Sequence, residues 1–294
     1  MGSVGDLIGG PLYQKMLDAM QLRGFSPRTE QSYQIAITGL ARYYQRPPNQ
    51  ISIEEIQQYF LYLVKERQLA PASCHVYLNG IRFFYLQVLG WVSFEITIHI
   101  PKCPQRTPEL LTHHEVATIL TAPENPRHKM LLTCCYACGL RVSELVNIQV
   151  QHIDGERHVL RVEQGKGRKD RYVSIGNSLL YRLRVYWSDY RPGKWLFPSI
   201  YHKDKERHLS IVSAQTIFRE AKKKAKITKT GGIHSLRHAY ATHQLEAGIS
   251  LPHLQHQLGH SNINTTMRYI HLLPTAHADL IAALPFDSVS PAME

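Results

Sequence analysis

The stretch LGHSNINTTMRYIH, residues 258–271, decides how the rest of the chain is interpreted. It places His260 nine residues before Tyr269, which directly follows Arg268. A tyrosine in a helical stretch is usually half-buried, with its ring against apolar side chains and its hydroxyl in contact with solvent. The other polar residues of the chain must therefore show whether Tyr269 packs or reacts.

Length and composition indicate a globular protein of two domains. The chain has 294 residues, of which 44% are hydrophobic. No segment approaches the ~20 uninterrupted apolar residues of a membrane span. The N-terminus has neither the basic region nor the long apolar region of a secretory signal. We therefore expect a cytoplasmic protein with no membrane partner.

The charge points to a polyanionic partner. The net charge is +11 and the pI is about 9.4. Residues 1–104 hold 9 basic and 7 acidic residues, whereas residues 105–294 hold 25 and 16. Most of the positive charge therefore belongs to the second part of the chain. A solvated surface would give a similar excess, so charge alone leaves nucleic acid as one of two interpretations.

Cys134, Cys135 and Cys138 form the one cluster among five cysteines. A CxxC pair could be half of a zinc site or a redox pair. No second pair lies at zinc spacing, and MLLTCCYACGL predicts a buried helix in which cysteine packs as a small hydrophobe. An intracellular chain of this size does not need disulfides for stability, so the five cysteines are compatible with a reducing compartment.

Residues 1–104 predict a small bundle of four helices. The expected helices span 11–23, 27–45, 53–67 and a last one from Pro71. Ser26-Pro27 is an N-cap followed by proline, and Ser52 with Glu55 forms a capping box. Short loops between such helices are typical of a bundle. HIPKCPQRTPE, residues 99–109, has three prolines and predicts an extended linker.

Residues 105–294 predict a mixed domain. Thr112 and Glu115 form a second capping box, and helices follow as far as Gly139. RHVLRVEQGKGRKDRYVSI, residues 157–175, has two β-prone runs around a Gly-Lys-Gly turn and predicts a hairpin. Helices resume near Ser178. The expected fold class is mainly α with a small antiparallel β-sheet.

Six residues of the second domain could together act on a phosphate. They are Arg141 in GLRVSELVNI, Lys166 at the hairpin tip, His234 and Arg237 in IHSLRHAYATH, and His260 and Tyr269. Two guanidiniums can clamp the negative charge that builds on a phosphodiester under attack. Histidines can move protons near neutral pH, and a lysine on a turn can protonate a leaving oxygen. A tyrosine becomes a nucleophile where neighbouring cations favour its phenolate, and Arg268 could add to that field.

This order of residues resembles the tyrosine recombinases, the phage-integrase-type site-specific recombinases. GLRVSEL, GKGRKDR, HSLRHAYATHQLEAG and LGHSNINTTMRYIH all match in their local context. The resemblance covers residues 110–273 strongly and residues 11–90 more weakly. It implies a helical core-binding, SAM-like domain in residues 1–104 and a mixed α/β catalytic domain in residues 105–294.

The resemblance also implies a mechanism without metal or cofactor. Tyr269 would attack the scissile phosphate of DNA, leaving a 3′-phosphotyrosyl enzyme and a free 5′-hydroxyl. Lys166 would protonate the 5′-oxygen. The remaining roles would be phosphate binding by Arg141 and Arg237, assistance by His234 and His260, and support of the active-site arginine by Glu144. His253, His256 and His260 have roughly helical spacing, but no carboxylate or thiolate lies nearby to complete a metal site.

The implied partner is double-stranded DNA, bound by four protomers on two recombination sites. Each protomer would donate its C-terminal segment to a neighbour, and HADLIAALPF, residues 277–286, has the length and apolar face for this. An ordinary helix docked on its own protomer is the alternative. The expected DNA-backbone contacts are Arg168 and Lys169 at the hairpin tip and Arg219, Lys222, Lys223, Lys224 and Lys226 in REAKKKAKITK. The second cluster could equally be a solvated helix face.

Two other classes of function remain open. A topoisomerase IB-like enzyme would cut and reseal DNA without exchanging partners, and a non-catalytic DNA-binding relative would keep only the basic surface. The presence of all six residues argues against the second. Among recombinases, the two-domain layout favours a mobile-element integrase or a Xer-like enzyme. The stretch from Lys166 to His234 is short for the extra segment of integron integrases.

Overall fold

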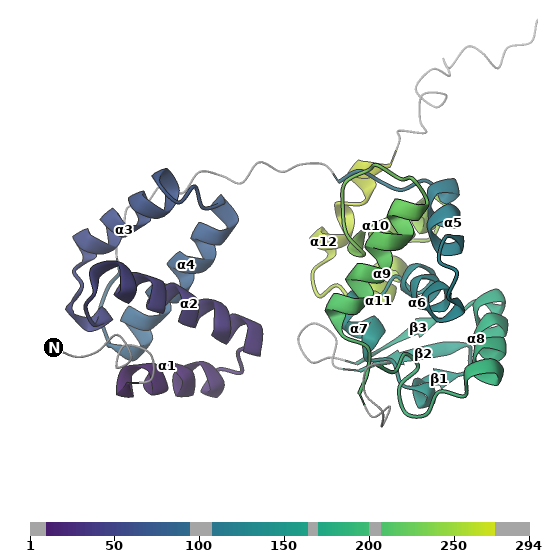
Figure 1. Ribbon diagram of the computed structural model, residues 1–294, viewed down its shortest axis with the longest axis horizontal. Helices are drawn as coiled ribbons and strands as arrows, with labels where there is room; N and C mark the ends of the chain where they lie inside the picture. The colour runs from purple at the N-terminus through teal and green to yellow at the C-terminus, as the bar shows by residue number, and fades with distance from the viewer. Residues whose placement is uncertain (1–9, 95–107, 164–169, 200–206, 274–294) are drawn as a thin grey trace, which may run out of the picture. The chain divides into compact units, whose positions relative to one another are not determined.

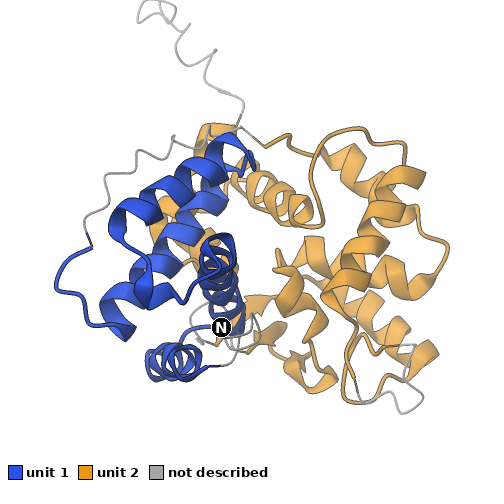
Figure 2. Cartoon of the chain, turned by 60° about the vertical axis from the view of Figure 1, so that its left-hand side comes forward, with its two compact units in different colours: residues 1–106 blue, residues 107–294 orange. Residues whose placement is uncertain are grey.

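The computed structural model describes residues 10–94, 108–163, 170–199 and 207–273 (Figure 1). The chain divides into two compact units, residues 1–106 and 107–294, coloured separately in Figure 2. The boundary expected at Pro104 falls outside the described residues. Within the described ranges, no helix is long and apolar enough to cross a membrane.

Residues 10–94 form a helical bundle. Its elements are α1 (Pro11–Leu22), α2 (Pro27–Tyr44), the 3-10 turn η1 (Pro48–Gln50), α3 (Ile53–Lys65), α4 (Pro71–Phe83) and the π-helical turn η2 (Phe84–Val88). The predicted N-cap and capping box are confirmed: Ser26 Oγ accepts from the Thr29 amide, and Ser52 and Glu55 cap each other. Gly80 allows α4 to approach α2 closely, because a Cβ there would lie 3.1 Å from Tyr33 Cα. The four predicted helices are therefore confirmed.

The second unit is mainly helical around one small sheet. In chain order its elements are α5 (His113–Thr121), α6 (Pro126–Ala137), α7 (Val142–Val146), η3 (Val150–His152), β1 (Ile153–Asp154), β2 (Val159–Val162), β3 (Arg171–Ser174), α8 (Asn177–Tyr190), α9 (Ile211–Lys224), α10 (His234–Glu246), α11 (Leu251–Leu258), α12 (Ile263–Met267) and η4 (Ile270–Leu272). The three strands pair antiparallel in the order β1-β2-β3. The predicted fold class and hairpin are confirmed, and the hairpin tip, residues 164–169, lies outside the described residues.

The sheet places one charged side chain on the buried face. Side chains alternate along β3, so Arg171 and Val173 are buried while Tyr172 and Ser174 are exposed. Val162 pairs with Arg171 across the ladder. The guanidinium of Arg171 therefore projects toward the helices rather than toward solvent.

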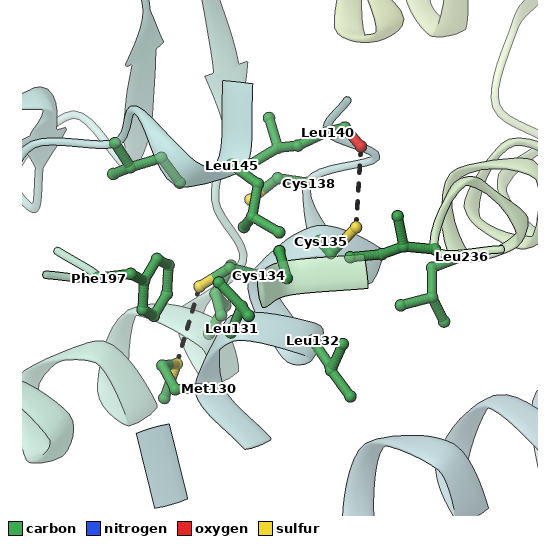
Figure 3. Close-up of a cluster of buried hydrophobic side chains, with 14 of the residues drawn as sticks. Met130, Leu131, Leu132, Cys134, Cys135, Cys138, Leu140, Leu145, Phe197 and Leu236 are labelled. Atoms are coloured by element: carbon green, nitrogen blue, oxygen red, sulfur yellow. Dashed lines mark hydrogen bonds between the residues drawn. The ribbon is translucent and has the colours of Figure 1, made fainter. Parts of the chain in front are cut away.

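Helix α6 runs through the core of the second unit, as Figure 3 shows. Its cysteines Cys134 and Cys135, with Cys138 just beyond, are free and buried among apolar side chains such as Leu145 and Phe197. Burial raises the pKa of Cys135 and of Cys138 to about 12, so both stay neutral thiols. The interpretation of these cysteines as small hydrophobes is confirmed.

Gly139 ends this helix and opens the site. Its φ of +57° lies in the left-handed region, and a Cβ there would come within 2.4 Å of Tyr240 Cδ1. Only glycine therefore allows the chain to turn against α10 at this position. The turn leads directly to Arg141 and α7.

Candidate active site

Arg141 is the N-cap residue of α7 and is held by Glu144, three residues later. Glu144 accepts hydrogen bonds from the Arg141 amide (2.9 Å) and from its Nη1 (2.8 Å). The same guanidinium donates to the carbonyls of Leu258 and Gly259, both at 3.3 Å. These bonds tie the start of α7 to the end of α11.

Glu144 lies within a group of three arginines. Arg171 donates to it through both terminal nitrogens, at 2.8 and 2.9 Å, and Arg237 Nη1 lies 3.8 Å from Glu144 Oε2. Burial alone would raise the pKa of this carboxyl, but the hydrogen bonds and charge of Arg171, and then those of Arg141, lower it to about 2. Glu144 is therefore an ionised anchor for the arginines, and the group keeps a net positive charge.

Arg237, in the second turn of α10, is the most buried charged residue of the site, with 1% of its surface exposed. It donates through Nη1 to the Gly139 carbonyl (2.7 Å) and through Nη2 to the Leu258 carbonyl (2.7 Å) and His260 Nε2 (3.0 Å). Burial, followed by the charge of Arg141, lowers its pKa to about 10, which still leaves it protonated at neutral pH. The guanidinium is fixed in one orientation by main-chain acceptors.

The tautomer of His260 follows from its partners. A guanidinium only donates hydrogen bonds, so His260 Nε2 accepts from Arg237 and the ring proton resides on Nδ1. Nδ1 donates to Thr266 Oγ1 at 2.8 Å. Burial and then Arg237 lower the pKa of His260 to about 4, so the ring is neutral at pH 7. Both ring nitrogens are therefore engaged within the protein.

Tyr269, between α12 and η4, both packs and faces the site. It is 5% exposed and belongs to an apolar cluster with Leu254 and Leu258. Its hydroxyl lies 3.1 Å from His238 Nδ1, and its ring lies parallel to that of His260 at a centroid distance of 6.3 Å.

The phenol is not held as a phenolate. Burial raises the pKa of Tyr269, and the charges of Arg237 and Arg141 offset only part of that increase. Burial therefore outweighs the cations that favour the phenolate in this structure. The cations that act on the phenol are Arg237 and Arg141, while the side chain of Arg268 is exposed.

His234 begins α10, and its ring stands edge-on to that of His238 at 4.5 Å between centroids. The residue is exposed to solvent, yet desolvation of its ring, followed by the charges of His238 and Arg237, lowers its pKa to about 4. His234 therefore lies at the open edge of the group as a neutral imidazole.

The structure brings together Arg141, Glu144, His234, Arg237, His260 and Tyr269. Lys166, and with it Arg168 and Lys169, falls outside the described residues.

The basic cluster on and after α9 is partly paired. Arg219 donates to Thr216 Oγ1 at 3.3 Å, Lys224 forms an ion pair with Glu124, and Lys222 donates to the Lys229 carbonyl. Lys223 and Lys226 are exposed and have no hydrogen-bond or ion-pair partner among the described residues. These two are the cations best available to an external anion.

Two residues of the site were not predicted from the sequence. His238 lies four residues after His234, hence on the same helical face, and that spacing is the signal that could have indicated it. Arg171 ends the GKGRKDR motif and lies on the buried side of a strand whose register shows only in the structure.

One group outside this site has metal-binding residue types. Within the described ranges, ligand atoms of His113, His243 and Glu246 lie within 4.8 Å of one another. His243 Nε2 must carry a proton to bond the Leu111 carbonyl (3.0 Å), so Nδ1 accepts from Tyr136 Oη (2.9 Å). With both ring nitrogens engaged, His243 fits a structural role better than a ligand role.

Comparison with known proteins establishes the family. Residues 109–275 match the phage integrase family, and residues 12–92 match the N-terminal SAM-like domain of phage integrases. The chain therefore belongs to the phage integrase family and is a tyrosine recombinase, as the sequence motifs predicted.

Individual relatives agree with this assignment. A putative integrase/recombinase, y4qK of Sinorhizobium fredii, is 39% identical over 91% of this chain and 86% of the relative. Tyrosine recombinase XerA of Pyrococcus horikoshii is 27% identical over 90% of each chain. A crystal structure of XerA recombinase matches with a TM-score of 0.53 at 25% identity, covering 92% of this chain and 96% of that one. The Tn1549 transposon integrase in complex with transposon right end DNA shares the fold, with a TM-score of 0.68 at 16% identity over 88% of this chain and 94% of that one.

Proposed function

We propose that this protein is a site-specific recombinase that cuts and rejoins double-stranded DNA through a 3′-phosphotyrosyl intermediate on Tyr269. The observation that carries the proposal is the position of Tyr269, whose ring lies parallel to that of His260, the residue that accepts a hydrogen bond from Arg237. The net charge of +11 suits a polyanionic substrate. A relative of the same fold, the Tn1549 integrase, is described in complex with DNA.

The two arginines would bind the non-bridging oxygens of the scissile phosphate. Arg141 and Arg237 are held by carbonyls and by Glu144, so their remaining N–H groups need no reorientation when negative charge builds. Lys166 would give a proton to the leaving 5′-oxygen. The phosphotyrosine conserves the bond energy, so a 5′-hydroxyl of a partner strand can reverse the reaction without nucleotide hydrolysis.

His234 and His260, the two histidines of the six-residue signature predicted from the sequence (Arg141, Lys166, His234, Arg237, His260 and Tyr269), have different roles in this proposal. His260 accepts from Arg237 and thereby positions the guanidinium rather than the phosphate. His234 has no hydrogen-bond partner among the described residues and lies at the edge of the site, so its ring N–H is available to a phosphate oxygen.

The proposed assembly is a homotetramer on two DNA sites. Residues 277–286, which would be exchanged between protomers, lie outside the described residues. Residues 1–104 would form the core-binding domain, a role that the match to the SAM-like domain of phage integrases favours.

A nicked suicide substrate tests the proposal. Substrates are built from DNA that flanks the gene. A nick beside the cleavage point lets the short fragment that carries the new 5′-hydroxyl diffuse away, which traps the covalent adduct. We expect a denaturation-resistant protein–DNA adduct with the wild type and none with Tyr269→Phe. Tyr181→Phe is the matched control, since Tyr181 is 68% exposed on α8. Equal adduct formation by Tyr269→Phe, or none by the wild type, would refute the proposal.

Strand exchange separates recombination from topoisomerase-like resealing. With two intact sites, a recombinase joins strands of different partners, whereas a topoisomerase IB-like enzyme only relaxes supercoils. We expect joined products that depend on both sites. Relaxation without joined products would favour the alternative.

A further inference from the structure

Two imidazoles, those of His238 and His260, lie against the ring of Tyr269, but only His238 places a nitrogen at its hydroxyl. His238 Nδ1 lies 3.1 Å from the phenolic oxygen. His260 cannot take the phenol proton in this arrangement, because Nε2 accepts from Arg237 and Nδ1 donates to Thr266. Among the described interactions, His234 contacts the ring of His238 and makes no hydrogen bond to Tyr269.

We propose that His238, which lies outside the six-residue signature, is the general base that accepts the phenolic proton of Tyr269 when the DNA strand is cut. This inference rests on the proposed function. It assigns to His238 a step for which neither His234 nor His260 has the geometry.

During strand cleavage, the O–H bond of Tyr269 breaks and its proton moves to His238 Nδ1, forming an imidazolium. The phenolate oxygen forms a bond to phosphorus, and the bond from phosphorus to the 5′-oxygen breaks with its electron pair on that oxygen. The 5′-oxygen receives a proton from Lys166. Rejoining reverses each transfer, so His238 returns the proton to Tyr269.

His238 can adopt the tautomer that this step requires, with the ring hydrogen on Nε2. Proton transfer from oxygen to Nδ1 needs the ring hydrogen on Nε2. His238 Nε2 has no partner within the described part of the chain that would force the other tautomer. A donor–acceptor distance of 3.1 Å is within the range for direct proton transfer.

The surrounding charges keep the base neutral before the reaction. Among the described residues, the titratable or charged groups that contact or act on His238 are His234 and Arg237 on its own helix and Tyr269 beside η4. Burial, followed by the charge of Arg237, lowers the pKa of His238 below its ordinary value. A protonated phenol therefore faces an unprotonated imidazole, and a bound phosphate would offset the positive charge that opposes imidazolium formation.

His238→Asn in the full chain tests the assignment, because Oδ1 of asparagine can accept the hydrogen bond near the Nδ1 position but cannot hold the proton. We expect single-turnover cleavage of the suicide substrate at pH 7 to slow by about 100-fold or more. DNA affinity and the thermal midpoint should stay at wild-type values. The rate should rise with pH in His238→Asn as hydroxide replaces the base, whereas the wild-type rate should be level above neutral pH. Wild-type rate and pH profile in His238→Asn would overturn the inference.

Three controls separate base catalysis from packing. His114→Asn, on the exposed face of α5, should cleave at the wild-type rate. Added imidazole should restore cleavage to His238→Gly in proportion to its concentration, and failure to do so would contradict the proposal. A bridging 5′-phosphorothiolate, whose leaving sulfur needs no acid, should rescue Lys166→Ala but not His238→Asn. Rescue of His238→Asn would make His238 an acid and overturn its assignment as base.

The two proposals fail in different ways. If the wild type forms no covalent adduct, both the function and this inference are wrong. If the wild type forms the adduct through Tyr269 while His238→Asn behaves normally, only the inference is wrong.

Discussion

Replacement of Glu144 by glutamine should destabilise the catalytic unit by about 3 kcal/mol at pH 7. Glu144→Gln keeps the shape of the side chain but removes the negative charge that faces Arg141, Arg171 and Arg237. It also turns an N–H₂ group toward guanidiniums that can only donate. Removal of one partner from a buried ion pair typically costs 3–5 kcal/mol, because the remaining charge stays buried.

The pKa of Glu144 gives the same magnitude independently. The carboxyl titrates at about 2 in the folded protein against an ordinary value of 4.5, and only 4% of the side chain is exposed. A lowered pKa means that ionisation stabilises the fold above the unfolded pKa and that this stabilisation is lost as pH falls through the folded pKa. The ionised carboxylate thus contributes about 3 kcal/mol at neutral pH, falling to about 1 kcal/mol near pH 3.

Thermal unfolding of wild type and Glu144→Gln between pH 3 and 7 measures this difference. For a unit of this size we expect the midpoint to fall by about 6–12 °C at pH 7, with the two proteins converging toward pH 3. Glu156→Gln is the control, because Glu156 is exposed in a turn and should leave the midpoint unchanged. A midpoint within 2 °C of wild type at pH 7, or a difference that does not vary with pH, would refute the reasoning.

Two further predictions concern DNA binding and assembly. Changing Lys223 and Lys226 to glutamine together should lower the slope of log affinity against log salt by about 2 if both contact phosphates, while Lys224→Gln, already paired with Glu124, should change it little. An unchanged slope in the double variant would make the cluster a solvated helix face. Truncation from Thr275 should weaken cooperative synapsis and leave single-site binding intact, because it removes the proposed exchanged segment. Gel-shift assays measure the salt slope and single-site binding, and light scattering measures tetramer formation. Full tetramer formation by the truncated chain would contradict the proposed assembly.

Local sequence signals predicted the elements of the fold well. The capping residues Ser26, Ser52 and Thr112 all accept the hydrogen bonds expected of them, because capping depends on neighbours within three residues. The Gly-Lys-Gly hairpin is also a local signal. The π-helical turn after α4 was not predicted, since it depends on how Phe84 and Tyr85 pack in the bundle core.

The electrostatics of the site could not be predicted in the same way. Spacing put His234 and Arg237 on one face of a helix, but the net pKa of Tyr269 depends on burial by residues from other elements. Arg171 shows the same limit, because only the strand register and the packing of α11 bring its guanidinium to Glu144. Sequence patterns therefore identified the charged groups, whereas burial set their protonation.

The hydrogen bonds of Arg141 and Arg237 determine how many N–H groups each guanidinium could still offer to a DNA phosphate. Both N–H groups of Arg237 Nη2 are used by Leu258 and His260, and one of Nη1 is used by Gly139. In Arg141, Nη1 donates to Glu144 and Leu258, and Nη2 gives one bond to Gly259. A guanidinium has five N–H groups, so each arginine keeps two that none of these three hydrogen bonds uses. In the proposed mechanism these four N–H groups would be available to the two non-bridging phosphate oxygens, enough for each arginine to contact both oxygens without breaking the bonds that fix the guanidiniums.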